Sequence, residues 1–404
     1  MAIRVRGWIS RMRSGTSGIS LGVALTLALG VVATSAPAQT FRVLYTFRGS
    51  PDGQWPYAGV IRNTHGDLYG TTYFGGSSND GTVFRVNTTR HDTVIYGFAG
   101  GTADGEYPTG GLLRDKAGDL YGTTTVGGAY GDGVAFKVDA EGRETVLHSF
   151  AGGTTDGCLP SGGLTEDKSG NFYGTTLECG AFGYGTVFKI DKGGAETVVH
   201  SFAGGRSDGR NPSLSGLLID EKANLYGVTE YGGGTGCGGD TGCGTVYKLD
   251  ASGKLTVLYA FSGGATDGCF PSGTPIINKK GVLYGTTSQC GSSNEGQIWE
   301  LSKTGVETVL HNFSNGSDGE YPLAGVVLDS KGNIYGDTEY GGPFGGGVVY
   351  KLSKSGVLTP LHNFGSQGGD NLIGGLIRDK SNNLYGTAVQ GGNGGDGTVW
   401  KLTP

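Results

Sequence analysis

Short apolar segments alternate with glycine-rich polar turns along most of the chain. A typical stretch has apolar runs at 111–115, 119–125, 134–138 and 144–150, separated by turns rich in glycine and charged residues. Runs of this length that are bounded by turn residues predict β-strands, and none shows the 3.6-residue period of an amphipathic helix. The pattern therefore predicts a unit of four short strands.

This four-strand unit recurs along the chain. Its second strand has a central tyrosine, as in Leu-Tyr-Gly-Thr-Thr at 120–124. The equivalent tyrosines are Tyr69, Tyr121, Tyr173, Tyr226, Tyr284, Tyr335 and Tyr385. Seven copies at a period of about 50 residues, each with four strands, are typical of a β-propeller. The sequence therefore predicts an all-β fold, a seven-bladed β-propeller of four-stranded antiparallel blades over residues 39–404.

The two ends of the repeat region are complementary. The last copy stops after its third strand, at 397–402, whereas the segment 41–47 has the pattern of an isolated fourth strand. Closing the ring would remove the unpaired strand edges that promote aggregation. We therefore expect the N-terminal strand 41–47 to complete the last blade by lying beside 397–402.

Residues 1–38 have the pattern of a secretory signal peptide. Four arginines precede an apolar run at 19–32, and the small residues of a cleavage site follow at 36–38. The apolar run is interrupted by glycine and threonine and is shorter than the roughly 20 residues that span a bilayer. We therefore expect cleavage, no membrane insertion of the mature chain, and a secreted or periplasmic location.

The charge balance excludes one class of partner. The chain has 30 basic and 36 acidic residues, and removing the four arginines of the signal peptide leaves 26 basic residues and a net charge near −10. Nucleic acids bind basic surfaces, so no nucleic-acid partner is expected. The 83 glycines fall mostly at fixed turn positions of the repeat, which favours an ordered chain over a low-complexity one.

Two pairs of cysteines occupy equivalent positions in two different copies. Cys158 and Cys179 are 21 residues apart, and so are Cys269 and Cys290. An even number of cysteines in an exported protein favours disulfides. In a propeller, the loop before a blade and the loop between its middle strands share one rim. The spacing therefore predicts the disulfides Cys158–Cys179 and Cys269–Cys290, each within one blade.

The fourth copy has a longer loop between its second and third strands. The step from the central tyrosine to the third-strand aromatic residue is 21 residues there, from Tyr226 to Tyr247, and 15 in the other copies. The insertion contains Cys237 and Cys243. We therefore expect a local insertion that is closed by a Cys237–Cys243 disulfide.

These motifs resemble a bacterial family of exported tandem-repeat proteins, the GloVer-repeat, choice-of-anchor proteins. The resemblance rests on Leu-Tyr-Gly-Thr-Thr at 120–124, the Gly-Gly loop after it, and Gly-Thr-Val-Phe-Lys at 185–189, and it covers about residues 41–404. It implies export and a repeat fold, and it implies no reaction. The blades are more loosely similar to those of NHL-type propellers, most of which bind partners.

The histidines are placed as structural residues. Four of them share one position of the fourth strand, where other copies have tyrosine: His148, His200, His311 and His362. On the outer strands of different blades they would lie too far apart to share a metal, and no histidine remains for the rim. The pattern argues against a Ser-His-Asp triad or a histidine-rich metal site, and we expect no metal centre.

An Asp-Gly-x-x-Pro motif precedes the first strand in six copies. It begins at Asp52, Asp104, Asp156, Asp208, Asp267 and Asp318. Clustered carboxylates could bind calcium, whereas a single aspartate before glycine is typical of a turn that caps its own backbone. One carboxylate per loop favours the turn. No cofactor is predicted, with calcium as the weaker alternative.

Residues that differ between copies indicate where a ligand could bind. The rim loops carry aromatic residues beside the proline or after the second strand: Trp55, Phe74, Tyr107, Tyr231, Phe270, Tyr321 and Tyr340. Aromatic rings can stack on the apolar C–H faces of sugars, although such residues also pack locally. The preferred hypothesis is a secreted, monomeric, non-enzymatic propeller that binds an extracellular glycan or protein on its rim.

The alternative hypothesis is a carbohydrate-active enzyme, a glycoside hydrolase or lyase. The rim loops also carry Glu178, Glu230 and Glu339, and acid–base cleavage of a glycosidic bond needs two carboxyl groups roughly 5–10 Å apart. This hypothesis predicts that two of the three glutamates lie within that distance of each other.

Overall fold

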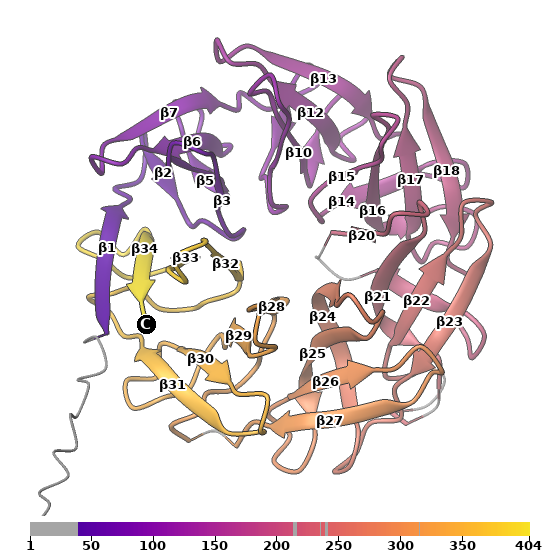
Figure 1. Ribbon diagram of the computed structural model, residues 1–404. Helices are drawn as coiled ribbons and strands as arrows, with labels where there is room; N and C mark the ends of the chain where they lie inside the picture. Colours follow the sequence, from indigo (N-terminus) through magenta and orange to yellow (C-terminus); the bar gives the residue numbers. More distant parts are fainter. Residues whose placement is uncertain (1–38, 213–215, 235, 239–240, 315) are drawn as a thin grey trace, which may run out of the picture. The chain divides into compact units, whose positions relative to one another are not determined.

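A computed structural model describes residues 39–404 except 213–215, 235, 239–240 and 315. The predicted signal peptide lies outside these described residues. Every named element is a β-strand, and seven antiparallel sheets form a ring (Figure 1). Residues of all seven blades line a central cavity, which we call the channel. The predicted seven-bladed β-propeller is confirmed. Within the described part of the chain, no helix has the length and apolar character needed to cross a membrane.

Each blade runs from a short inner strand beside the channel to a longer outer strand. Blade 1 has β3 (Ile61–Arg62), β4 (Leu68–Thr72), β6 (Thr82–Val86) and β7 (Asp92–Gly97). Blade 2 has β9 (Leu113–Arg114), β10 (Leu120–Thr124), β12 (Val134–Val138) and β13 (Glu144–Ser149). Blade 3 has β14 (Gly157–Pro160), β15 (Thr165–Glu166), β16 (Phe172–Cys179), β17 (Thr186–Ile190) and β18 (Glu196–Ser201).

The remaining blades follow the same order. Blade 4 has β19 (Gly209–Pro212), β20 (Leu218–Ile219), β21 (Leu225–Gly232), β22 (Thr245–Leu249) and β23 (Leu255–Ala260). Blade 5 has β24 (Gly268–Ile277), β25 (Leu283–Cys290), β26 (Gln297–Leu301) and β27 (Glu307–Asn312). Blade 6 has β28 (Val327–Leu328), β29 (Ile334–Asp337), β30 (Val348–Leu352) and β31 (Leu358–Asn363). Blade 7 has β32 (Leu376–Arg378), β33 (Leu384–Ala388), β34 (Thr398–Thr403) and β1 (Thr40–Thr46).

Two small sheets extend blades 1 and 2 on one rim. They pair β2 (Gly53–Gln54) with β5 (Phe74–Gly75), and β8 (Gly105–Glu106) with β11 (Val126–Gly127). The same segments in blades 3, 4 and 5 are joined to the blade sheets as β14, β19 and β24. We call this side of the ring the loop rim, because it carries both the loop before each blade and the loop between its second and third strands.

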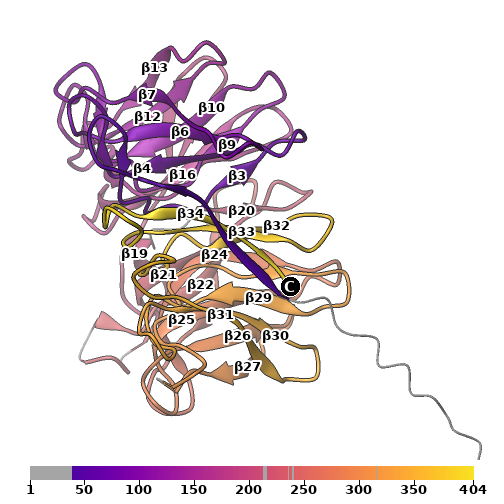
Figure 2. The same ribbon diagram turned by 90° about the vertical axis from the view of Figure 1, so that its left-hand side faces the viewer.

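The ring closes as predicted, with the N-terminal strand in the last blade. β1 pairs with β34 in antiparallel register from Thr40 opposite Thr403 to Thr46 opposite Thr398. Figure 2 shows the indigo β1 beside the yellow end of the chain. Phe47, directly after β1, is fully buried and packs edge-on against Phe84 of blade 1, with ring centroids 5.0 Å apart. Closure therefore joins blade 7 both to its own third strand and to blade 1.

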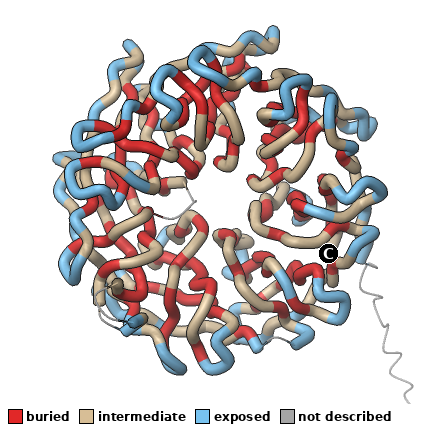
Figure 3. The backbone as a smooth tube through the Cα atoms, turned by 180° about the vertical axis from the view of Figure 1, so that it is seen from behind, coloured by how far each residue is buried: buried red, intermediate tan, exposed pale blue. Residues whose placement is uncertain are grey.

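The same aromatic contact recurs between every pair of neighbouring blades. A phenylalanine after each fourth strand meets the third-strand aromatic ring of the next blade at 4.9–5.9 Å, as in Phe150 with Phe188 and Phe261 with Trp299. In Figure 3, buried positions follow the strands and exposed positions gather in the outer loops. The repeat tyrosines also pack between blades as expected, since Tyr121 joins the cluster around Phe172 of blade 3. The core is therefore continuous around the ring.

A backbone hydrogen bond connects each blade to the next on the loop rim. One residue of the loop before each blade has a positive φ of 52–63°, although it is never glycine: Trp55, Tyr107, Leu159, Asn211, Phe270, Tyr321 and Asn371. It precedes a proline in six blades and Leu372 in blade 7. Its N–H donates to a carbonyl in the preceding blade's second loop, as Tyr107 does to Asp80 at 2.9 Å. A left-handed conformation is costly for residues other than glycine. The repeated hydrogen bond explains why it persists here.

The aspartates of the Asp-Gly-x-x-Pro motif cap their own turns. The Asp156 carboxylate accepts hydrogen bonds from the N–H groups of Gly157, at 2.6 Å, and Ala151, at 2.8 Å. Asp104 accepts equivalent bonds from Gly105 and Ala99. This is the geometry that the turn interpretation predicts.

All three predicted disulfides are present, as Cys158–Cys179, Cys237–Cys243 and Cys269–Cys290. Cys179 and Cys290 have φ values of 65° and 64°, and the equivalent residues in the other blades are glycines, such as Gly127 at 85°. These two cysteines therefore adopt a conformation that favours glycine, and the disulfide offsets the cost of that conformation.

Converting blade 3 to the blade 2 pattern should weaken the fold. We expect the double variant Cys158→Glu, Cys179→Gly, which reproduces Glu106 and Gly127, to lose about 3 kcal/mol by opening the loop. Glycine at the left-handed position should return roughly 1 kcal/mol of this. Urea unfolding of the oxidised proteins measures the difference. An unchanged midpoint would contradict a stabilising role for this disulfide.

Candidate functional site

The central channel opens on the loop rim and has an uncharged wall. A cavity of about 530 Å³ is lined mainly by small and apolar residues, for example Ala58, Gly163, Leu217, Ala324 and Gly374. None of the described residues that line it is charged. A neutral wall of this kind suits a neutral ligand better than an ionic one.

A cluster of five aromatic side chains lies on the loop rim where blades 1 and 2 meet. We call it the aromatic arc; its members are Trp55, Tyr57, Tyr73, Phe74 and Tyr107. Tyr73 is the central ring: it stacks on Tyr107 at 4.9 Å with an angle of 17° and contacts Tyr57 at 5.0 Å. All five side chains are half-buried, so their packing fixes the rings while part of each stays accessible to solvent.

Tyr57 connects the aromatic arc to the channel. Its side chain lines the channel cavity, and its pKa is raised by burial and by the neighbouring Tyr73 and Glu339. Glu339 belongs to blade 6, so its carboxylate acts on Tyr57 across the intervening blade 7. The mouth of the channel thus has aromatic rings on one side and a carboxyl group on the other.

Two acidic side chains flank the arc. The carboxyls of Asp80 and Glu106 both lie close to Gly100, and the N–H of Gly101 donates to Glu106 at 2.8 Å. Burial and the charge of Glu106 raise the pKa of Asp80. Burial, Asp80 and Glu106 also raise the pKa of Tyr107. This edge of the arc therefore offers hydrogen-bond acceptors beside the rings.

The seven aromatic residues predicted from the sequence fall into three groups. Trp55, Phe74 and Tyr107 belong to the aromatic arc. Tyr231 and Phe270 contact each other at 5.3 Å between blades 4 and 5. Tyr321 and Tyr340 lie 6.4 Å apart in blade 6. Only the first group forms a larger cluster.

In the second group, an arginine side chain lies over the ring of Tyr231. The guanidinium of Arg210 lies 5.1 Å from the ring centre of Tyr231. A cation over one face of a ring leaves that face unavailable for stacking. Tyr231 is therefore a weaker candidate for ligand contact than the rings of the aromatic arc.

A cluster of glutamates lies on the rim between blades 5 and 6. Burial and the neighbouring Glu295 raise the pKa of Glu320. Burial and Glu320 raise the pKa of Glu339, while its hydrogen bond with Tyr340 lowers it. Oε2 of Glu295 is buried and has no hydrogen-bond partner among the described residues. The protonated forms of Glu320 and Glu339 are thus favoured relative to an isolated glutamate.

The three glutamates singled out from the sequence lie in three different blades. Glu178 is on β16 of blade 3, Glu230 is on β21 of blade 4, and Glu339 follows β29 of blade 6. The carboxyl groups that act on Glu339 belong to Glu320 of its own blade and not to Glu178 or Glu230. Among the three, Glu339 alone belongs to a cluster of acidic residues at the channel mouth.

Sequence reasoning missed Tyr57 and Tyr73, and the repeat itself contains the signal for them. Position 57 is occupied in other blades by residues such as Thr109 and Ser272, and position 73 by residues such as Thr125 and Ser288. Large aromatic residues that appear at a position in one copy only are candidates for a specific role, because packing common to all blades does not need them.

Further exposed aromatic residues stand at the tips of the second loops. Tyr130, Phe182 and Phe344 occupy equivalent positions in blades 2, 3 and 6 and are 66%, 59% and 72% exposed. They extend the aromatic character of the loop rim outward from the channel. Exposed aromatic residues on one face are typical of a surface that binds a partner.

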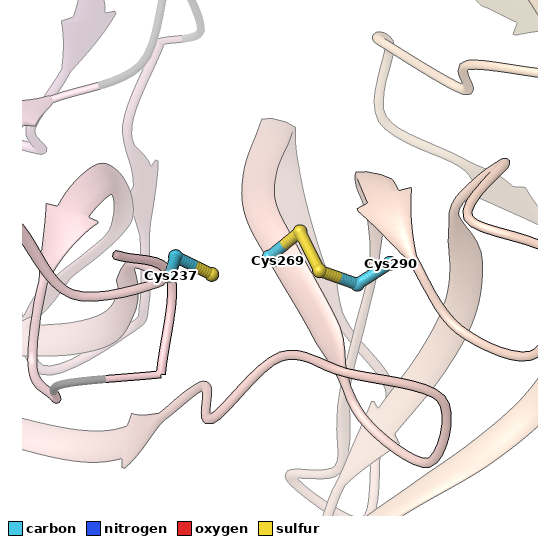
Figure 4. Close-up of side chains that lie close together, drawn as sticks. All are labelled: Cys237, Cys269 and Cys290. Atoms are coloured by element: carbon cyan, nitrogen blue, oxygen red, sulfur yellow. A yellow bond between two sulfur atoms is a disulfide. The ribbon is translucent and has the colours of Figure 1, made fainter. Parts of the chain in front are cut away.

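Two disulfides meet at the junction of blades 4 and 5. The sulfur atoms of Cys237, Cys269 and Cys290 lie within 4.8 Å of one another, and Figure 4 shows the Cys237 sulfur directed toward the Cys269–Cys290 bond. Both sets of sulfurs are oxidised, so thiolate ligands for a metal are absent from this cluster of described residues. The insertion of blade 4 is held against blade 5 at this point.

Fold and rim together define the protein as a tandem-repeat β-propeller with an uncharged channel and an aromatic loop rim. The profile of the Gloeobacter/Verrucomicrobia repeat matches residues 24–239 and 235–404. The chain belongs to this family, and the resemblance to GloVer-repeat proteins is confirmed. A comparison with curated proteins found no match.

Several solved structures are similar to the fold at low sequence identity. Virginiamycin B lyase from Staphylococcus aureus is 12% identical, with 91% of this chain and 100% of that chain covered and a TM-score of 0.57. A streptogramin B lyase is 14% identical, with 90% and 97% covered and a TM-score of 0.54. A puromycin hydrolase is 13% identical, with 84% and 50% covered and a TM-score of 0.51. These likenesses show the fold alone.

Proposed function

We propose that this protein binds a neutral carbohydrate on its loop rim, with the aromatic arc as the contact surface. The arc supports the proposal because five half-buried rings are held in fixed positions at the mouth of an uncharged channel. Rigid aromatic faces bind apolar surfaces with little loss of side-chain entropy. The C–H faces of sugar rings are such surfaces, and their hydroxyl groups can donate to the nearby carboxylates.

The disulfides also support a location outside the cytoplasm. Three disulfides are typical of proteins that fold in an oxidising compartment. We propose that the protein acts in the periplasm or outside the cell, where polysaccharides are available as ligands.

Variants that copy residues from other blades can test carbohydrate binding without disturbing the fold. Tyr73→Thr reproduces Thr125 of blade 2, and Tyr107→Leu reproduces Leu159 of blade 3. We expect each to weaken binding of the best oligosaccharide about tenfold or more, because each removes a central ring of the arc. Isothermal titration with neutral oligosaccharides, selected first on an array, measures the change.

A matched control comes from the opposite side of the ring. Phe270→Leu changes the same repeat position as Tyr107→Leu, but in blade 5, and it should leave the affinity unchanged. The proposal fails if no neutral oligosaccharide binds, or if Phe270→Leu weakens binding as much as Tyr107→Leu does.

A second candidate function is cleavage of a carbohydrate by the acidic residues of blades 5 and 6. The raised pKa values of Glu320 and Glu339 support it, because a raised pKa favours the protonated carboxyl group that a general acid needs. Incubation with a polysaccharide panel, with new reducing or unsaturated ends as the readout, distinguishes the two functions. Cleavage that is lost in Glu339→Gln would favour the enzyme, and retention without product would favour the binding protein.

A further inference from the structure

The outer junctions between blades share a three-residue arrangement. A ring from the fourth strand of one blade meets the aspartate of the next blade's Asp-Gly turn, and the first residue of that blade's fourth strand lies beside them. Four junctions have an acid at the third position: Tyr45, Asp52 and Asp92; Tyr96, Asp104 and Glu144; His148, Asp156 and Glu196; and Tyr259, Asp267 and Glu307.

The remaining junctions lack one or two of the three groups. Two have a histidine and an aspartate with leucine at the third position: His200, Asp208 and Leu255; and His311, Asp318 and Leu358. In the last junction, His362 stacks on Phe41 at 3.8 Å, and the sequence has Gly368 at the position of the aspartate. Within the described residues, therefore, one junction combines a histidine with two carboxylates.

That junction lies between blades 2 and 3. Nε2 of His148 is 3.1 Å from Oδ2 of Asp156, and one donor atom each from His148, Asp156 and Glu196 lie within 4.8 Å of one another. Oε1 of Glu196 is buried and has no hydrogen-bond partner among the described residues. One imidazole nitrogen and two carboxylate oxygens thus converge at a single point, with one of the oxygens unsatisfied.

We propose that His148, Asp156 and Glu196 form a zinc-binding site at this junction. Zinc binds imidazole nitrogen and carboxylate oxygen at about 2.0–2.2 Å, so two ligands of a tetrahedral ion lie about 3.4 Å apart. The separation of His148 and Asp156 is close to that value. The ion takes the place of the hydrogen bond between them, with little movement of either side chain.

The surroundings hold the ligands in place and leave the site accessible. The N–H groups of Gly157 and Ala151 donate to the Asp156 carboxylate and fix its orientation, as outer contacts do for metal ligands generally. The side chains of His148 and Asp156 are 21% and 11% exposed, which gives an ion a path from solvent. Three protein ligands leave one position of a tetrahedral ion for water or for an oxygen of a ligand.

The three ligands come from three separate segments. His148 is on β13 of blade 2, Asp156 is in the loop between the blades, and Glu196 is on β18 of blade 3. An ion held by all three joins the outer edges of neighbouring blades. Because such a site exists only in the folded protein, zinc should raise the unfolding temperature.

The test uses residues 39–404 without a histidine tag, freed of metal by a chelator and titrated with Zn²⁺ alone. Isothermal titration and mass spectrometry of bound metal should show one zinc per wild-type chain. His148→Tyr copies Tyr96, and Glu196→Leu copies Leu255, so both changes occur naturally in this fold. We expect both variants to fold, as judged by circular dichroism, to bind no zinc, and to lose the zinc-dependent rise in unfolding temperature.

A gain-of-site variant gives an independent check. Tyr259→His places an imidazole beside Asp267 and Glu307 and should raise the zinc content from one to two per chain. Three results would each overturn the proposal: a wild-type chain without zinc at micromolar concentrations, a folded His148→Tyr or Glu196→Leu variant that still binds one ion, or a Tyr259→His variant that binds no second ion.

Discussion

Deleting residues 39–47 is expected to abolish the folded monomer. The deletion removes β1 and with it the partner of β34, so blade 7 is left with an unpaired edge strand. It also removes Phe47, which is fully buried against Phe84, and loss of such a side chain alone costs about 3–5 kcal/mol. An exposed edge and a hole between blades 7 and 1 favour aggregation. Size-exclusion chromatography and circular dichroism of the deleted chain measure the effect.

A point variant and a peptide separate loss of packing from loss of the strand. Phe47→Ala keeps β1 and should give a monomer with a lower unfolding temperature. A synthetic peptide of residues 39–48, added during refolding of the deleted chain, should restore a monomer-sized complex. A deleted chain that stays monomeric, with the unfolding temperature of the full chain, would refute closure by β1.

Replacing Asp337 by threonine is expected to stabilise the protein, most strongly above neutral pH. Asp337 is 1% exposed, and neither of its carboxylate oxygens has a hydrogen-bond partner among the described residues. Five other blades have threonine at this position, and Thr123 donates its hydroxyl to the Gly162 carbonyl of the next blade at 2.9 Å. Threonine should therefore restore a hydrogen bond between blades 6 and 7.

The pH dependence follows from the pKa of the buried carboxyl group. Burial raises the pKa of Asp337 from 3.8 to about 7, so between these values the folded protein binds a proton that the unfolded chain lacks. The contribution of Asp337 to stability is therefore full below pH ~4 and is lost as the pH rises through about 7, by ~1.4 kcal/mol per unit and on the order of 4 kcal/mol in all. Threonine does not titrate, so this loss should be absent in the variant.

Urea unfolding at several pH values measures the difference. The two proteins should be most alike near pH ~4 and most different near pH ~8. Asp337→Asn serves as the control, because it keeps the polar shape and removes the titration. A difference in stability between the wild type and Asp337→Thr that does not grow between these pH values would contradict this account.

The fold could be predicted because the sequence contains seven copies of one four-strand unit. The tyrosine period set the number of blades, and the incomplete last copy indicated where β1 belongs. The disulfides could be paired because Cys158 and Cys179 replace two residues that change together in one copy and again in another. Each of these predictions compared a residue with its own equivalents in the same chain.

The candidate sites were harder to predict, because they depend on contacts between copies. His148 and Asp156 each belong to a repeated motif and were interpreted separately, although their side chains meet across a blade boundary. Glu196 lies 40 residues after Asp156 in the sequence, and its side chain lies beside theirs. Two other blades have leucine at the equivalent position. Neighbouring blades determine such contacts through their packing, which no spacing within one motif reveals. The same holds for Tyr57, whose pKa is raised by burial and, across blade 7, by Glu339.

The hydrogen bond that joins each left-handed residue to the preceding blade has an evolutionary consequence. It uses main-chain atoms only, and the side chain at that position is tryptophan, tyrosine, leucine, asparagine or phenylalanine in different blades. This main-chain hydrogen bond between neighbouring blades therefore does not depend on which side chain stands at that position. Blades of this kind can be duplicated, exchanged or recombined as cassettes, each bringing its own recognition residue to the rim while the architecture stays constant.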